Sequence, residues 1–187
     1  MQPLTTNHGF TLLELLVVMT IVAVLTTFAI PGFAGWVERR HTDADRALLA
    51  TTIYGARTAA IHLNQPVVMC PGDDQGCGRR NSWHEGAVVF ADPNRNGRLD
   101  RGETLVGGFG ALNGTVQWRS FRNRSYLRFL PNGLTDWQNG HFLLCPTTDD
   151  PDLARQLVLN RAGRLYFSID ADGDGRHEDV QDNPLEC

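Results

Sequence analysis

The pattern of apolar residues divides the chain into a first third with helical spacing and a longer part with short apolar runs separated by turn residues. Residues 10–30 are almost wholly apolar, and a helix of that length spans about 30 Å, enough to cross the hydrocarbon core of a membrane. From residue 32 to about 64, apolar residues recur at three- and four-residue steps. This spacing predicts an amphipathic continuation of the helix, bent near Pro31 because proline lacks a backbone donor. The predicted apolar face contains Phe33, Trp36, Val37, Ala44, Ala47, Leu48, Ala56 and Ala59.

Beyond residue 65, short runs rich in Val, Phe, Tyr and Leu alternate with clusters of Gly, Asn, Asp and Pro, a pattern typical of strands and turns. The runs predict strands at 66–70, 86–91, 104–108, 115–121, 126–130, 141–145, 155–160 and 164–169. A long helix followed only by strands predicts an α+β fold with antiparallel sheet packed on the helix. The expected segments are 1–9, 10–30, 31–64 and a β-rich globular domain at 65–187.

One ionisable residue, Glu14, lies inside the apolar run. A carboxylate facing lipid at mid-depth costs about 2.5–3.5 kcal/mol, so Glu14 is expected to have a partner. The residues before the run are polar and contain neither Lys nor Arg, unlike the basic start of an ordinary secretory signal. The natural cleavage point therefore lies before the run, between Gly9 and Phe10. The alternative is a plain single-span anchor with a stray glutamate.

The N-terminus resembles the type IV prepilin signal, because Gly9, Phe10, Glu14 and Pro31 keep its offsets. The resemblance implies cleavage after Gly9 by a prepilin peptidase and N-methylation of Phe10. It also implies that Glu14 pairs with the new amine of a neighbouring pilin, and that 1–9 is a leader and 10–30 a transmembrane and filament-core helix.

Motifs further along the chain narrow the resemblance to the GspH/FimT group of minor pilins and pseudopilins. They are CPGDDQGC, W-x-x-G-A-V-V-F, D-x-N-x-N-G-x-x-D-x-G-E, F-x-P-x-G, N-G-H-F-L-L-C and L-V-L-N-R-A-G-R. Members start or cap type IV pili or type II secretion pseudopili, and some FimT members bind DNA. The resemblance implies a pilin fold, a single pass through the inner membrane, a periplasmic domain, and other pilins and the inner-membrane assembly machinery as partners. The leading interpretation is a minor pilin in pilus initiation; a type II secretion pseudopilin and a DNA-binding pilin are the alternatives.

Four cysteines all follow the apolar run. An even number in an exported domain favours disulfides over a metal cluster, and four cysteines allow three pairings. The favoured pairing is Cys70–Cys77 with Cys145–Cys187, which the resemblance also implies. The six histidines are scattered and no nucleophile–base pair is evident, so the sequence predicts a protein that is not an enzyme and needs no cofactor.

Two acidic segments raise the question of calcium. The first fits D-x-[DN]-x-[DN]-G-x5-E and would offer oxygens from Asp92, Asn94, Asn96, the Arg98 carbonyl, Asp100 and Glu103. The alternative is a polar hairpin turning at Asn96-Gly97, because the flanking residues are predicted strands. The second segment has Asp170, Asp172, Asp174, Gly175 and Glu178, but Gln181 at the closing position. It is expected to be a solvated acidic tail, with a metal site as the alternative.

A net charge of −4 gives no general attraction to nucleic acid. Locally, residues 118–129 interleave four arginines with four aromatics, which makes this the best candidate segment for phosphate contacts and base stacking. The candidate DNA-binding residues are Arg119, Arg122, Arg124 and Arg164. Alternation in a pair of strands gives the same pattern, with aromatics inward and arginines outward. Gly163-Arg164 begins the Gly-Arg-x-Arg motif of DNA-binding FimT proteins, but Tyr166 departs from it.

Overall fold

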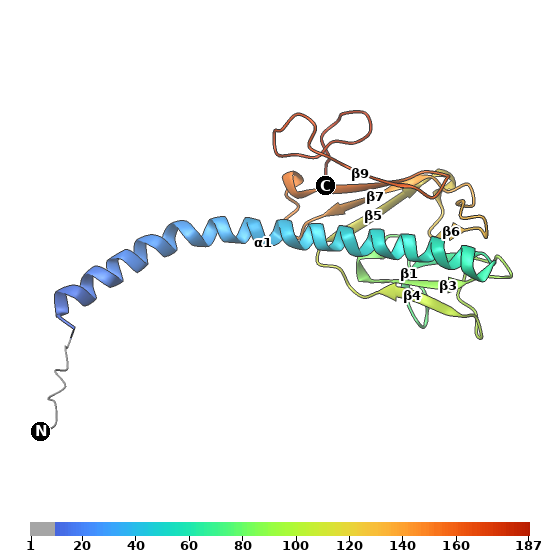
Figure 1. Ribbon diagram of the computed structural model, residues 1–187, viewed down its shortest axis with the longest axis horizontal. Coiled ribbons are helices and arrows are strands. Elements are labelled where there is room, and N and C mark those ends of the chain that lie inside the picture. Colours follow the sequence, from blue (N-terminus) through green and yellow to red (C-terminus); the bar gives the residue numbers. More distant parts are fainter. Residues whose placement is uncertain (1–9) are drawn as a thin grey trace, which may run out of the picture. The chain divides into compact units, whose positions relative to one another are not determined.

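One helix, α1 (Leu12–Leu63, 52 residues), carries the apolar run directly into the rest of the chain (Figure 1). The computed structural model describes residues 10–187, except for the side chains of residues 28–34 and of Arg122. Gly9 and the rest of the predicted leader therefore lie outside the described residues. The helix starts where the Thr11 hydroxyl accepts a hydrogen bond from the backbone N–H of Glu14 at 3.2 Å, which caps its first turn. It continues through Pro31, and the bend expected there stays a prediction.

The chain divides into two compact units, Met1–Val37 and Glu38–Cys187, and all strands belong to the second. One sheet has the order β2-β1-β3-β4, with β6 also paired to β1, and the other has the order β5-β7-β8-β9. The strands of the first sheet are β1 (Val67–Asp73), β2 (Gly76–Cys77), β3 (Ala87–Ala91), β4 (Leu105–Phe109) and β6 (Leu127–Phe129). Those of the second are β5 (Thr115–Ser120), β7 (Gly140–Cys145), β8 (Arg155–Leu159) and β9 (Leu165–Phe167).

Every strand pairing is antiparallel, which confirms the predicted α+β fold. The eight predicted strands all form; seven agree with their expected ends within two residues, and β1 runs three residues further than predicted, to Asp73. The short hairpin strand β2, the division into two sheets and the 3-10 turns η1 (Trp83–Glu85), η2 (Phe121–Asn123) and η3 (Pro151–Leu153) were not predicted.

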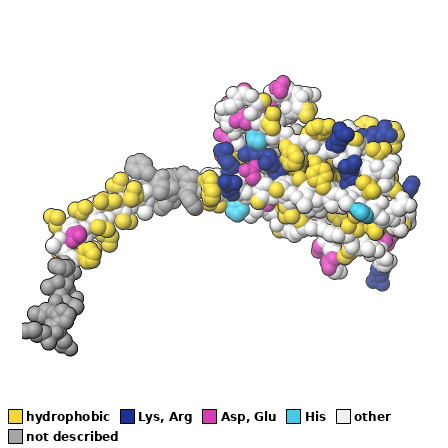
Figure 2. Space-filling view, viewed as in Figure 1, with side chains coloured by type: hydrophobic (Ala, Val, Ile, Leu, Met, Phe, Trp, Pro, Cys, Tyr) yellow, Lys and Arg dark blue, Asp and Glu magenta, His cyan; other side chains and the backbone are white. Residues whose placement is uncertain are grey.

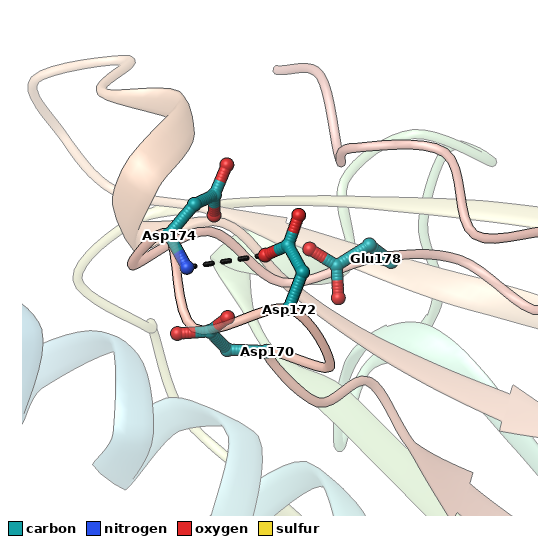
Figure 3. Close-up of side chains that lie close together, drawn as sticks. All are labelled: Asp170, Asp172, Asp174 and Glu178. Atoms are coloured by element: carbon teal, nitrogen blue, oxygen red, sulfur yellow. Dashed lines mark hydrogen bonds between the residues drawn. The ribbon is translucent and has the colours of Figure 1, made fainter.

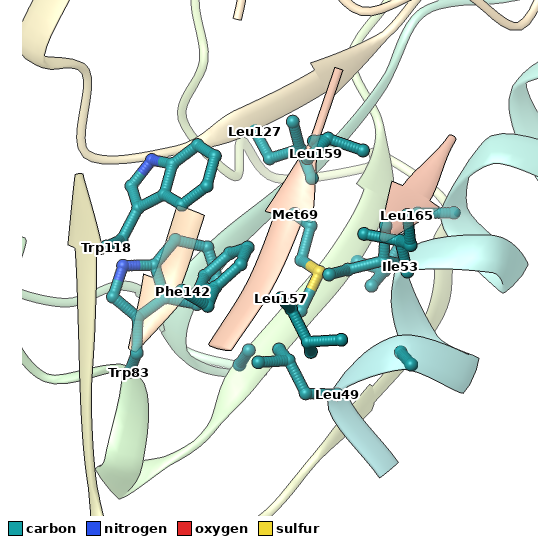
Figure 4. Packing of buried hydrophobic residues seen from close by; sticks show 14 of the residues in the cluster. Leu49, Ile53, Met69, Trp83, Trp118, Leu127, Phe142, Leu157, Leu159 and Leu165 are labelled. Carbon is teal, nitrogen blue, oxygen red and sulfur yellow. The ribbon is translucent and has the colours of Figure 1, made fainter. Parts of the chain in front are cut away.

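The core of the second unit joins α1 to both sheets. Leu49, Ile53, Ala56 and Ala60 of the helix are buried in one cluster with side chains from β1, β3, β5, β6, β7, β8 and β9. Aromatic rings fill one end of this cluster (Figure 4). Trp118 stacks on Phe142 with ring centroids 4.2 Å apart, and Trp83 meets Phe142 edge-on at 5.0 Å. Such pairs add about 0.5–1.5 kcal/mol to the burial of their area.

The predicted apolar face of the helix is partly wrong. Ala44, Ala47 and Leu48 are exposed, and the buried face instead contains Thr42, Asp45, Leu49, Ile53, Ala56 and Ala60. The reason is polar: the Asp45 carboxylate accepts hydrogen bonds from the backbone and side-chain nitrogens of Asn113, both at 2.9 Å, and from Gly114 N. A helical face predicted from the spacing of apolar residues alone leaves out a buried carboxylate whose hydrogen bonds are satisfied.

Both favoured disulfides are present. Cys70–Cys77 closes the hairpin of β1 and β2, and Cys145–Cys187 ties the C-terminal segment to the end of β7. The described chain contains no free cysteine.

Candidate functional site

The N-terminal unit presents an apolar surface with one carboxylate. All described side chains from Phe10 to residue 27 are exposed, and Figure 2 shows hydrophobic groups covering this segment around an acidic side chain. Glu14 is the one Asp or Glu among residues 10–27. The hydroxyls of Thr20, Thr26 and Thr27 donate to helix carbonyls three or four residues earlier. These threonines therefore satisfy their own polar groups and leave the helix surface apolar.

No helix in the described part of the chain is long and apolar enough to cross a membrane. Phe10 lies two residues before α1 and Glu14 lies in its first turn, and both are exposed. Their roles in processing and assembly, and that of Pro31, stay predictions.

The first acidic segment is organised around a guanidinium. Asp92 is fully buried and its Oδ2 lies 2.9 Å from Nη2 of Arg128, which also donates to the Arg95 carbonyl at 2.8 Å. The same carboxylate accepts from the backbone N–H groups of Asn96 and Gly97, each at 3.0 Å. An internal cation thus neutralises the residue that opens the calcium motif.

The amides in this loop act as donors. The side-chain nitrogens of Asn94 and Asn96 bond to Asp100 Oδ2 at 2.9 and 2.6 Å, and these bonds hold the pKa of Asp100 below its ordinary value. Burial raises the pKa of Glu103, helped by the nearby charges of Asp92 and Asp100. A calcium ion would need oxygens where the structure has these amide donors. Calcium binding by this loop stays a prediction, and the Arg128 ion pair competes with it.

The second acidic segment gathers its carboxylates. Asp170, Asp172, Asp174 and Glu178 have oxygens within 4.8 Å of one another, and this is the one group of three or more potential metal-ligating acids, histidines or cysteines in the described residues (Figure 3). Glu178 is 8 % exposed and accepts a hydrogen bond from the Ala171 N–H. The expectation of a simple solvated tail holds for the three aspartates but not for Glu178, which the sequence pattern could not place inside.

Two of the four aromatic residues of the proposed DNA patch are buried, whereas Phe121 is 57 % exposed. Trp118 and Phe129 are buried in the core, so the alternative with aromatics inward is correct for β5 and β6. The same alternative placed the arginines outward, and this is wrong for Arg128, which is 4 % exposed and forms an ion pair with the buried Asp92.

The structure does not gather the proposed DNA-binding arginines into one described cluster. Arg124 donates to the Tyr126 hydroxyl and lies 3.9 Å from Asp136. Arg119 on β5 and Arg164 before β9 are exposed, and the side chain of Arg122 lies outside the described residues.

A long helix with an apolar, glutamate-containing start, built at its other end into an antiparallel two-sheet domain, defines the class of type IV pilin-like proteins. A family model described as Type II transport protein GspH matches residues 47–163, and one described as Prokaryotic N-terminal methylation motif matches residues 4–30. The chain belongs to the GspH family. Pilins and pseudopilins of this kind are structural subunits.

Solved structures agree at the level of fold. Two crystal structures of the type IV minor pilin FimU from Pseudomonas aeruginosa are similar, at 17 % sequence identity in both cases and TM-scores of 0.51 and 0.53. They cover 68 and 72 % of this chain and 92 % of the FimU chain. A search of curated proteins finds no match.

Proposed function

We propose that this chain is a minor pilin of a type IV pilus and acts as a structural subunit in pilus initiation and assembly. The observation that carries the proposal is the continuity of α1. The segment that matches the methylation motif ends at residue 30, and the same helix continues to Leu63 within the core of the globular unit. The matched segment and the domain are therefore joined by one helix, with no separate linker element between them.

In this proposal the precursor is held in the inner membrane by residues 10–30, with the domain in the periplasm. Cleavage after Gly9 gives Phe10 a positive amine. When subunits bundle, Glu14 of one and the amine of its neighbour both leave water, and each charge alone is strongly disfavoured there. Pairing neutralises both, so correct register between subunits is favoured over slipped ones. The exposed Leu48, Tyr54 and Ile61 of α1 offer further apolar contact.

The first experiment replaces Glu14 by Ala in cells that assemble pili. We expect cleavage at Gly9–Phe10 to remain, as mass spectrometry of the mature N-terminus would show, and incorporation into sheared filaments to fall at least tenfold. Glu85→Ala, an exposed glutamate outside the apolar helix, is the matched control and should assemble normally. Normal incorporation of the Glu14 variant would refute the docking role. A mature N-terminus other than Phe10, or processing that survives Gly9→Val, would refute the prepilin assignment.

The second candidate is a pseudopilin of type II secretion, which the description of the matching family model favours. Deleting the gene separates the two candidates. If the chain is a minor pilin, the deletion should abolish surface filaments and leave exoprotein secretion intact. If it is a pseudopilin, the deletion should abolish secretion and leave the filaments intact. Complementation with the full chain must restore whichever activity is lost.

A further inference from the structure

A groove of about 830 Å³ lies beside β5 in the globular unit. One wall is the loop after the Cys70–Cys77 hairpin, and the other is the strand itself. The lining residues are Arg79, Arg80, Asn81, His84 and residues 115–119.

The groove is basic, although the chain as a whole is acidic. Arg79, Arg80 and Arg119 line it, and none of the three guanidinium groups has an ion-pair or hydrogen-bond partner within the described residues. No Asp or Glu is among its described lining residues. Arg119 also lines a second hollow that contains Asp149, Asp179 and Glu186. Arg79 and Arg80 line this groove alone, and their unpaired charges create a local positive potential that favours an anionic ligand.

The wall made by β5 is also an open sheet edge. Among the described strands β5 pairs with β7 alone, so its other edge, beside η1, keeps unpaired backbone N–H and C=O groups. Such an edge accepts an extended polypeptide as an additional strand, with main-chain hydrogen bonds giving affinity and side-chain contacts giving specificity.

Two buried nitrogen atoms at this place lack partners. Trp118 lines the groove and is 2 % exposed, and its indole N–H finds no acceptor in the described chain. Nδ1 of the lining residue His84 is likewise buried without a partner. In Figure 4 the indole nitrogen of Trp118 lies on the side of the ring away from Leu157 and Met69. An acceptor on a bound segment would satisfy the indole donor, which is costly to leave unpaired.

We propose that this groove docks an extended, carboxylate-bearing segment of a neighbouring pilin subunit, which adds to β5 as a further strand. The identity of the partner as a pilin rests on the proposed function, but the chemistry of recognition does not. A polypeptide fits better than a nucleic acid, because a strand edge matches peptide groups and because Trp118, the one Phe, Tyr or Trp among the described lining residues, is buried and unable to stack on a base.

The test uses the purified full chain in detergent micelles and a fluorescent peptide of alternating Glu and Val, measured by polarisation. We expect saturable binding that weakens with salt, and at least tenfold weaker binding by Arg79→Gln/Arg80→Gln. Arg98→Gln/Arg101→Gln is the matched control, because it removes the same charge from exposed arginines outside the groove and should bind like the wild type. A peptide of alternating Gln and Val should bind at least tenfold more weakly than the acidic one.

A second readout locates the contact. In ¹⁵N-labelled protein the acidic peptide should shift the indole N–H resonance of Trp118, identified by its loss in Trp118→Phe. The resonance of Trp137, which is 50 % exposed and does not line the groove, should stay in place. Equal peptide binding by wild type and groove variant, or an unmoved Trp118 resonance at saturation, would overturn the proposal. So would a single-stranded oligothymidylate that binds the groove more tightly than the peptide, since that result assigns it to nucleic acid. Peptide binding is independent of Glu14, so failure here and failure of the assembly experiment are distinguishable.

Discussion

The buried pair of Asp92 and Arg128 gives the sharpest stability prediction. Arg128→Met keeps an unbranched side chain of similar reach but leaves the Asp92 carboxylate, which is fully buried, without its cation at 2.9 Å. The carboxylate retains only the two backbone N–H bonds from Asn96 and Gly97. Removing one partner of a buried ion pair costs about 3–5 kcal/mol. For a domain of this size 1 kcal/mol corresponds to about 2–4 °C, so the melting temperature should fall by roughly 6–20 °C.

The assay is thermal and urea unfolding of the full chain in micelles, followed by circular dichroism. Asp136→Asn is the control, because it touches the same guanidinium at 3.1 Å from a partly exposed position and should cost less than about 1 kcal/mol. The double variant Asp92→Asn/Arg128→Met removes both buried charges and should be more stable than Arg128→Met alone. A loss below about 1 kcal/mol for Arg128→Met, or a double variant no better than that single, would refute the reasoning.

Further predictions concern acidity, cross-linking and calcium. Burial raises the pKa of Glu103 in the folded state, so the stabilisation from its protonation is complete below the unfolded pKa and is lost as pH rises. In chelator, Glu103→Gln should therefore have a higher melting temperature than the wild type at neutral pH. This difference in melting temperature should close on acidification. Cys145→Ser/Cys187→Ser opens a loop with a sequence separation of 42 and should lower the free energy of unfolding by about 4 kcal/mol in urea titrations. The metal alternative for the second acidic segment predicts that calorimetric titration detects Ca²⁺ binding, that Asp172→Asn weakens it at least tenfold, and that Asp182→Asn, a neighbouring exposed acid outside the cluster, leaves it unchanged. No binding, or equal binding by all three proteins, would leave the solvated tail.

The sequence predicted the elements well because each has a local cause. The apolar run and the helical spacing can be recognised without knowledge of tertiary contacts, and the turn residues on either side of each strand mark where it ends. Prediction failed where a polar group is buried. Asp45 turns inward because Asn113 and Gly114, 68 and 69 residues away, present donors to it, and no local pattern contains that information.

The functional sites show the same division. The prepilin signal is contiguous, so its residues could be proposed from sequence. The calcium motif that begins at Asp92 is also contiguous and could be recognised from sequence. The sequence pattern does not show that Arg128, 36 residues further on, pairs with Asp92. Arg79 and Arg80 carried no signal at all, because a groove arises only when their loop comes to lie beside β5. Spacing along the chain predicts chemistry only when the ligands are neighbours in sequence.

The disulfide beside the groove ties its shape to the redox state of the surroundings. Cys70–Cys77 closes the two-strand hairpin, and Gly78 N–H bonds to the Pro71 carbonyl at 2.6 Å, so the chain leaves the hairpin with a fixed direction just before Arg79. Thiols stay reduced in the cytosol and oxidise in the periplasm. If the domain is periplasmic, as in the proposed function, a newly made chain lacks this cross-link before export and acquires it afterwards. The hairpin that precedes the two groove arginines would then be completed only in the compartment where the proposed partners assemble.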